Sequence, residues 1–378
     1  MKTKSKPESR KAVVSFAAID RYVESNMVSS KEVYSSSRGI MLWGDNNLFP
    51  EYLLDLYKNV PTLGSIINGN IDYIVGDEIR IGAVDFMDQK MNPQGETITE
   101  QCRNIAHDYE LFGGFALMVR RNVNGGVAAV DYIDLRYLRL NKNGDVFYYS
   151  EKWAENGRKD VLQYPAFIAD LDWASLSEEE RGRHTASILY VKRGHTQVYP
   201  LPVYAQAIKS CEIERCIDDY HLNSIENGFT SSMIINFNNG VPDDEQKEAI
   251  EQDVNEKFSG HENAGRIMCS FNPDKESAAT FEVPDVKDFG ERYNALAKHS
   301  RQQIFTSFRA IPALFGLMSE STGFNTQEFE QSFKLYNRTQ IRPVQRLIAD
   351  AYDKIFGVQG ILTITPFDIS NVTETKVD

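Results

Sequence analysis

Catalysis by the common hydrolytic and phosphate-binding machineries needs side chains at fixed spacings, and this sequence holds none of them. It has no G-x-x-x-x-G-K-S/T loop, no G-x-S-x-G turn, no H-E-x-x-H pair and no H-x-E with P-C-x-x-C. Gly113-Gly114 and Gly125-Gly126 resemble a phosphate cradle superficially, and we interpret them as a strand start and a hairpin turn. We therefore predict a protein that is not an enzyme and needs no cofactor.

The metal-binding residue types are equally scattered. Adjacent carboxylates such as Asp218-Asp219 and Asp243-Asp244 point roughly 100° apart on a helix, so we interpret them as solvated or capping charges and predict no metal site. The six histidines stand singly, and they are interpreted as surface or core polar residues. The four cysteines form no C-x-x-C pair and are expected to be free thiols in a reducing compartment: Cys102, Cys211, Cys216 and Cys269.

Composition narrows the class of protein further. With 378 residues and 42% hydrophobic residues, the chain is long enough for two or three substructures. A net charge of −13 excludes a simple DNA-gripping domain, because such domains neutralise phosphates, but it permits a protein past which DNA slides. No apolar run is long enough to span a membrane, and the basic N-terminus lacks the apolar core of a secretion signal, so we expect a cytoplasmic location with no membrane partner.

The first half of the sequence predicts an α+β fold with antiparallel pairing. Residues 1–40 are polar and Ser-rich, and we expect a partly disordered arm with one short helix around Ala18 to Ser25. Pro50 and Pro61 each favour the start of an amphipathic helix, and another helix is predicted from Ile98 to Leu111. A hairpin around Asn124-Gly125, a turn at Asn143-Gly144 and a strand at residues 187–193 follow.

The second half predicts three long helices. The first, ended by Gly228, has apolar stripes on two sides and so needs neighbours on both flanks. A β-α-β insert with a strongly acidic helix follows, and a second long helix covers about Val286 to Ala310. The third, Thr326 to Phe356, should be capped by Asn325 and kinked by Pro343, and the final residues predict a strand.

Several short motifs, in register from about residue 45 to 365, resemble the portal proteins of long-tailed double-stranded DNA phages. An early N-x-L-F-P block near Asn47 to Pro50 looks like the start of that family's wing. The later motifs are Tyr199-Pro200, Asn238-Asn239-Gly240, Asp244-Glu245-Gln246, the turn at 260–265, Ile311-Pro312-Ala313-Leu314-Phe315-Gly316-Leu317, Asn325-Thr326-Gln327-Glu328-Phe329 and Arg342-Pro343-Val344. Each motif alone is weak, and their order is specific.

The resemblance implies a portal-type fold: a mixed α/β wing, two long stem helices flanking a small β-α-β clip, and a long kinked C-terminal helix. Only about twenty residues follow that helix, so the helical crown should be reduced or absent. The expected boundaries are 1–40 arm, 41–200 wing, 201–228 first stem helix, 229–285 clip, 286–311 second stem helix, 312–325 tunnel loop, 326–358 kinked wing helix and 359–378 C-terminal strand and tail.

The resemblance also implies a function. Portal subunits form a ring, usually of twelve, at one capsid vertex of the virion, through which DNA is packaged and ejected. The expected partners are the terminase large subunit, the head–tail adaptor, the major capsid and scaffolding proteins, and double-stranded DNA without sequence specificity, with assembly in the cytoplasm of the bacterial host. Two alternatives remain open: another head–tail connector ring, and a phage-encoded enzyme with an unrecognised site.

Three groups of residues are the predicted site. The tunnel loop, residues 312–325, is longer than an ordinary helix–helix connection, and we expect none of its side chains to be buried in a core. Its single charge should discourage phosphate binding, so we expect this loop to face DNA. The predicted residues are Leu317, Met318, Ser319, Glu320, Ser321, Thr322 and Gly323 for the loop; Asp244, Glu245, Glu248, Glu251 and Glu256 for clip docking; and Ile213, Ile217, Tyr220, Phe289, Tyr293 and Leu296 for packing between neighbouring stems.

Overall fold

The computed structural model describes residues 27–83, 86, 88–153, 161–194, 198–226, 233–237, 242–243, 246–247, 249–250, 267–271, 286–317 and 326–367. The chain divides into two compact units. Unit 1 comprises Met1–Lys209 and Gln303–Asp378, and unit 2 comprises Ser210–Gln302. The two units are described separately below.

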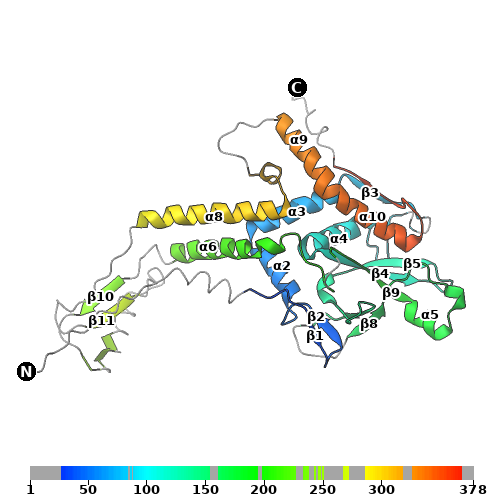
Figure 1. Ribbon diagram of the computed structural model, residues 1–378, viewed down its shortest axis with the longest axis horizontal. Coiled ribbons are helices and arrows are strands. Elements are labelled where there is room, and N and C mark those ends of the chain that lie inside the picture. The colour runs from blue at the N-terminus through cyan, green and yellow to red at the C-terminus, as the bar shows by residue number, and fades with distance from the viewer. Residues whose placement is uncertain are drawn as a thin grey trace, which may run out of the picture. The chain divides into compact units, whose positions relative to one another are not determined.

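Three helices of unit 1 begin and end where the sequence predicts. α2 (Phe49–Asn59) and α3 (Pro61–Val75) both carry proline in the first turn, where the missing N–H leaves no helical hydrogen bond unmade. α4 (Ile98–Phe112) is capped at Thr97, whose side chain and that of Glu100 satisfy each other's backbone N–H groups. Figure 1 shows the three helices together with the strands that follow them.

The main sheet of unit 1 is antiparallel, as predicted. Its strand order is β5 (Val127–Ile133), β4 (Gly114–Arg121) and β9 (Ala186–Lys192), and α4 packs against β4. Gly113 joins α4 to β4 in the left-handed region, at φ 89°. A Cβ atom at Gly113 would collide with the backbone carbonyl of Leu201, so no other residue fits this turn.

The smaller sheets of unit 1 are also antiparallel, which confirms the α+β class for this unit. β6 (Leu138–Leu140), β7 (Val146–Tyr149) and β8 (Leu162–Pro165) form one sheet. β3 (Glu78–Ile81) pairs with β12 (Leu362–Thr365), near the end of the chain. The short helices between strands are the 3₁₀ turns Leu135–Tyr137 and Trp173–Ser175 and helix α5 (Glu178–His184).

The described structure begins within the segment that was expected to be a partly disordered arm, residues 1–40. β1 (Val33–Ser35) pairs with β2 (Ile40–Leu42). The carboxylate of Glu32 accepts hydrogen bonds from the backbone N–H groups of Val198 and Tyr199, at 3.1 and 2.6 Å. The fold therefore includes residues well before 41, because a polar segment is held by contacts with a distant part of the chain. The helix expected at Ala18 to Ser25 lies outside the described residues.

Aromatic rings and one buried cation fill the centre of the N-terminal part of unit 1. Trp43 is 1% exposed and stacks on Tyr199 with ring centroids 4.7 Å apart. The guanidinium of Arg139 is also 1% exposed and donates to the backbone carbonyls of Arg136, Leu138 and Asn47. Burial lowers the pKa of Arg139 to about 10, because the charged form loses water.

The C-terminal helix, which the sequence predicted to be kinked by Pro343, contains an irregular segment. α9 (Thr326–Tyr336) runs into a π-helical segment (Asn337–Ile341) and then into α10 (Arg342–Phe356). Pro343 stands in the first turn of α10, where it needs no N–H partner. The irregular turn therefore lies just before the proline. The expected cap at Asn325 lies outside the described residues.

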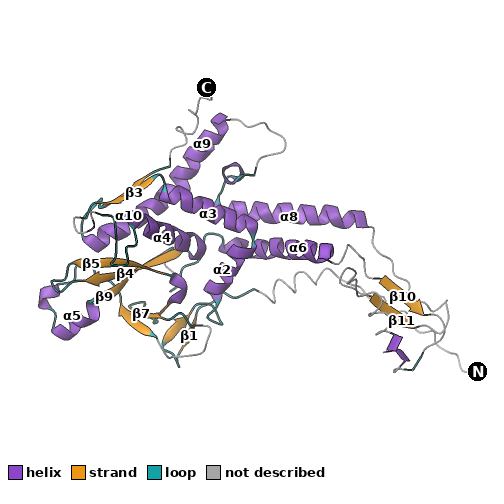
Figure 2. Ribbon diagram, turned by 180° about the vertical axis from the view of Figure 1, so that it is seen from behind, coloured by secondary structure: helices purple, strands orange, loops and turns teal. Residues whose placement is uncertain are grey.

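Unit 2 contains parts of two long helices and a pair of strands. α6 (Ile208–Glu226) begins later than the predicted residue 201, because a 3₁₀ turn (Ala205–Ala207) precedes it. β10 (Met233–Phe237) and β11 (Ile267–Phe271) pair in parallel, which fits the predicted β-α-β insert. α8 (Val286–Phe308) follows, and Figure 2 shows α6 and α8 side by side.

Candidate functional site

Within unit 2, the contacts between α6 and α8 include ring contacts and an ion pair. Tyr220 stacks on Tyr293 with ring centroids 4.8 Å apart and an interplanar angle of 15°. Two turns nearer the start of α6, the carboxylate of Glu214 lies 3.8 Å from the guanidinium of Arg301. Contacts at lower numbers on α6 therefore meet higher numbers on α8, so the two helices run antiparallel.

This helix pair buries two carboxylates. Glu212 and Glu214 are 0% and 3% exposed. Glu212 lies 2.7 Å from the guanidinium of Arg215, one turn along the same helix. Burying a carboxylate is costly unless a cation compensates it, so these ion pairs fix which faces of α6 are covered.

The predicted stem-packing residues do not share one environment. Ile217 is 6% exposed within the single chain, so its burial needs no neighbouring subunit. Tyr220 is 48% exposed although it stacks on Tyr293, and Leu222 is 56% exposed. Ile213, Tyr293 and Leu296 are half-buried. The side chain of Phe289 lies outside the described residues.

The start of the predicted DNA-facing loop is anchored in unit 1. Residues Pro312–Phe315 form a 3₁₀ turn in which Leu314 is 8% exposed. The hydroxyl of Tyr73 donates to the carbonyl oxygen of Leu314 at 3.1 Å. The expectation that nothing in this loop buries a core is therefore wrong for its first residues. Leu317 is 45% exposed, and the other predicted loop residues, Met318, Ser319, Glu320, Ser321, Thr322 and Gly323, lie outside the described residues.

Phe315 is the hydrophobic anchor of this turn. Its ring makes edge contacts with Phe305 and Tyr336, at centroid distances of 6.1 and 5.8 Å. A Cβ atom at Gly69 on α3 would lie 2.8 Å from the same ring, so the close approach of Phe315 depends on glycine there. The glycine at position 69 is visible in the sequence, in an asparagine- and glycine-rich stretch of α3. That Phe315 packs against this glycine can be known only from the fold.

A buried hydrogen-bond chain lies beside this anchor and links three helices. The hydroxyl of Tyr336 donates to Asn70 Oδ1 at 2.7 Å, and Asn70 Nδ2 donates to Glu110 Oε2 at 2.7 Å. Burial raises the pKa of Glu110 to about 7, although the hydrogen bond from Asn70 and the charge of Arg193 oppose the shift. This chain was missed by sequence reasoning, because its members are far apart in the sequence.

A second buried chain fixes α10 against α4 and the sheet. The hydroxyl of Tyr352 donates to Gln101 Oε1 at 2.7 Å, and Gln101 Nε2 donates to the carbonyl oxygen of Val130 at 2.6 Å. Gln345 donates to the carbonyl oxygen of Ile74 at 3.0 Å. The C-terminal helix is thus tied to three earlier elements by satisfied buried polar groups, which give a packing its specificity.

The predicted clip-docking residues cannot be placed. Asp244, Glu245, Glu248, Glu251 and Glu256 all lie outside the described residues, and their role stays a prediction. In the described strands of this insert, Phe237 stacks on Phe271 with ring centroids 5.2 Å apart.

Metal ligands, membrane spans and cysteines can be stated for the described residues alone. They contain no group of three or more His, Cys, Asp or Glu side chains that could hold a metal ion. No helix in the described part of the chain is long and apolar enough to cross a membrane. Cys102, Cys211 and Cys216 are free thiols, and burial raises the pKa of each.

Solved structures of other proteins have a fold similar to that of this chain. Several solved chains share the fold at 9–14% identity. One is a phage portal protein of the HK97 family from Corynebacterium diphtheriae, with a TM-score of 0.53, covering 87% of this chain and 97% of that one. Another comes from the neck of a native gene transfer agent particle computed with C12 symmetry, with 13% identity, a TM-score of 0.52 and coverage of 93% and 89%. The fold of this chain is therefore similar to that of these portal and neck proteins.

The sequence itself carries the family assignment. The family model described as "Phage portal protein" matches residues 84–374, so the chain belongs to the phage portal protein family. An uncharacterized protein of Rickettsia felis is 28% identical over 200 residues, which are 50% of this chain. The match spans about half of that relative, 49% of its length.

Proposed function

We propose that this chain is the subunit of a ring, of twelve copies, that forms the DNA channel at one vertex of a phage capsid. In this proposal its role is structural rather than catalytic. DNA passes through the ring during packaging and ejection, held without sequence specificity. The ring sits in the virion after assembly in the bacterial host cytoplasm. Its partners are the terminase large subunit, the head–tail adaptor, and the major capsid and scaffolding proteins.

One observation carries the ring assignment. The antiparallel pair of α6 and α8 leaves large apolar side chains exposed beside its aromatic contact, with Tyr220 48% and Leu222 56% exposed. Helices with apolar groups outside their mutual contact need another surface to cover them. A neighbouring helix pair provides that surface, and the family and the C12 neck structure support this source.

In the same proposal the portal parts keep their predicted places. Residues 41–200 and 326–358 form the wing, α6 and α8 form the stem, residues 229–285 form the clip, and the crown is reduced or absent. The acidic residues of the clip dock the terminase and later the adaptor, because charge patterns govern partner choice. The loop at 312–325 faces DNA, and its anchoring through Phe315 supports a loop fixed at its base.

The ring is tested by replacing an exposed residue instead of a buried one. Leu222→Glu adds charge at a position already in water, so the single chain should fold normally while rings are lost. Negative-stain imaging of the wild-type chain should show a central channel, and the variant should sediment as single subunits. Ile217→Glu is a poor test, because Ile217 is buried within its own chain. A Leu222→Glu protein that forms wild-type rings would exclude this surface as the ring contact.

A further inference from the structure

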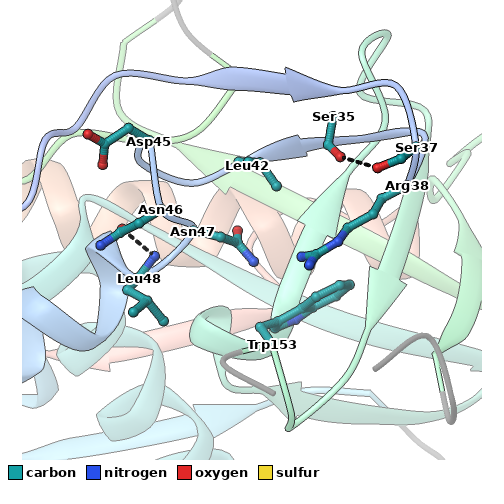
Figure 3. A pocket seen from close by; sticks show the side chains of 9 residues that line it. All are labelled: Ser35, Ser37, Arg38, Leu42, Asp45, Asn46, Asn47, Leu48 and Trp153. Atoms are coloured by element: carbon teal, nitrogen blue, oxygen red, sulfur yellow. Dashed lines mark hydrogen bonds between the residues drawn. The ribbon is translucent and has the colours of Figure 1, made fainter. Parts of the chain in front are cut away.

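The charge of this chain is locally reversed on its C-terminal helix. The sequence carries 54 Asp and Glu against 41 Lys and Arg, a net charge of −13. The polar cavity before α2, drawn in Figure 3, is balanced, since its lining holds one cation, Arg38, and one anion, Asp45. Residues 331–349, by contrast, contain four basic side chains and no Asp or Glu. This basic stretch runs through α9, the π-helical segment and α10, which follow one another in Figure 1.

The four basic residues share the exposed side of this helix. They follow one another at four-residue intervals, and residues at that interval are neighbours on a helix surface: Lys334, Arg338, Arg342 and Arg346. All four are exposed, whereas Ile341 between them is 1% exposed and faces the core. A rise of about 1.5 Å per residue makes the row from Arg338 to Arg346 roughly 12 Å long. We call Arg338, Arg342 and Arg346 the arginine stripe.

The arginine stripe is not neutralised by carboxylates in the described part of the chain. Three other exposed arginines of unit 1 each have a partner at 2.6 to 2.8 Å: Arg80 with Glu78, Arg103 with Asp72 and Arg183 with Glu179. Lys334, which precedes the stripe, lies 3.7 Å from Glu330. The stripe itself makes no ion pair with any described residue. Its guanidinium groups repel one another on consecutive turns, and a bound polyanion would remove this repulsion.

A row of cations of this length suits the phosphate backbone of a nucleic acid. Each strand of B-DNA carries one phosphate per roughly 3.4 Å of helix axis, so a row of roughly 12 Å lies beside about three phosphates. Arginine forms bidentate hydrogen bonds with phosphate, and no carboxylate within residues 331–349 would repel it. A second copy of the chain is a weaker match, because exposed acids such as Glu78 and Asp72 already pair with arginines of their own copy.

We propose that the arginine stripe holds the phosphate backbone of duplex DNA. The electrostatic contact with DNA then lies on the C-terminal helix and not on the loop at 312–325, whose sequence holds one acid, Glu320, and no Lys or Arg. The two segments divide the work, because the loop lets the duplex move whereas the stripe resists its loss. The binding of a polyanion rests on the stripe alone, and the identity of that polyanion as DNA rests on the proposed function.

The test is a triple variant of the full chain, Arg338→Gln with Arg342→Gln and Arg346→Gln. Fluorescence anisotropy measures its binding to a labelled duplex of about 30 base pairs between about 50 and 200 mM salt. Each lost phosphate contact lowers the slope of log affinity against log salt by about 1, so the slope should fall by about 3 and the affinity at about 100 mM salt at least about tenfold.

Two further variants separate the stripe from net charge and from arginine geometry. The matched control removes three exposed cations on other elements, Lys31→Gln with Lys58→Gln and Lys142→Gln, and should lower the slope by less than about 1. The charge-conserving change of all three stripe arginines to lysine should keep most of the slope, because counterion release depends on charge. Equal losses in the two glutamine variants would assign the affinity to net charge and overturn the inference.

Mass photometry of the same samples separates the stripe from the ring. An unchanged salt slope in a stripe variant that still forms rings would overturn the inference and leave the ring intact. Loss of rings without a change in that slope would make the stripe a contact between copies, which also overturns it. A wild-type chain that binds the duplex through the stripe but forms no ring would refute the ring and retain the stripe. A wild-type chain that does not bind the duplex would refute the stripe.

Discussion

The two units of this chain use buried polar groups in different ways. In unit 1, hydrogen-bond chains such as Tyr336–Asn70–Glu110 and Tyr352–Gln101 join residues far apart in the sequence. In unit 2, the contacts between α6 and α8 include the stack of Tyr220 on Tyr293 and the ion pair of Glu214 with Arg301, beside exposed apolar side chains. Unit 1 therefore joins distant parts of the chain through buried polar groups, whereas the described contact between α6 and α8 lies beside the exposed side chains of Tyr220 and Leu222.

The largest expected effect compares aromatic residues in the two units. Trp43→Ala removes a ring that is 1% exposed and stacked on Tyr199, so we expect a loss of about 3–5 kcal/mol in the free energy of unfolding. Tyr293→Ala removes a half-buried ring from the pair with Tyr220 and should cost about 1 kcal/mol in the unassembled chain. Urea unfolding followed by circular dichroism measures both. Equal losses would remove the contrast between the units.

The next expected effect is a dependence of the free energy of unfolding on pH, which comes from Glu110 in unit 1. The folded pKa of Glu110, about 7, lies above the ordinary value of 4.5, so the unfolded chain releases this proton more readily. Stability should therefore fall as pH rises from about 4.5 to 7, by up to about 3 kcal/mol, and Glu110→Gln should remove this slope. Asp108, whose pKa is raised to about 6 chiefly by burial, keeps a smaller slope at lower pH.

Urea unfolding of wild type and Glu110→Gln at pH 5, 6, 7 and 8 measures this difference. Glu100→Gln is the control, because Glu100 is exposed and its pKa is lowered by the capping hydrogen bonds with Thr97. The contribution of Glu100 to stability is complete above the ordinary pKa of a glutamate. The Glu100→Gln variant should therefore keep the wild-type slope of stability between pH 5 and 8. Identical slopes for wild type and Glu110→Gln would mean that Glu110 is charged in the folded chain.

A single hydroxyl tests the link between the C-terminal helix and α3. Tyr336→Phe leaves Asn70 Oδ1 buried without its donor, so we expect a loss of about 1–2 kcal/mol. Tyr34→Phe removes a hydroxyl from a side chain that is 48% exposed and should change stability by less than about 0.5 kcal/mol. Thermal unfolding of both variants gives the comparison, and equal melting temperatures would argue that the buried hydrogen bond contributes nothing net.

The smallest expected effect compares two helical glycines. Gly182 on α5 has nothing within 4 Å of a new Cβ, so Gly182→Ala should stabilise by about 0.5–1 kcal/mol. Gly69→Ala makes the same gain in helix propensity, but its Cβ would lie 2.8 Å from the ring of Phe315. We expect a net loss of up to about 1 kcal/mol and a more accessible 3₁₀ turn, measured by hydrogen exchange at 312–317. Stabilisation by both changes would mean that Phe315 moves freely.

The elements that the sequence predicted well are those specified by local chemistry. The prolines at 50 and 61 and the turn at Asn124-Gly125 act through their own backbone and need no distant partner. The β1–β2 hairpin was missed for the opposite reason. Its strands have three residues each, and Glu32 holds the segment through a contact more than 160 residues away.

The candidate site divides in the same way. Helical spacing predicted α6 and α8, but it could not tell that Ile217 is covered within its own chain whereas Tyr220 remains half exposed. Loop length predicted a special connection after Pro312, but the anchoring role of Phe315 depends on rings from α3, α8 and the C-terminal helix.

The π-helical segment has a consequence for the angular phase of the C-terminal helix. An ordinary helix advances roughly 100° per residue, so the buried Tyr336 and Val344 would be about 80° apart on an unbroken helix. The wide turn at 337–341 holds one extra residue, which offsets roughly 100° of rotation about the helix axis. The buried residues of α10 therefore lie on the same side of the helix as Phe333 and Tyr336. The wide turn is therefore a phase correction, and removing one residue from it would rotate α10 away from the surface that it now covers.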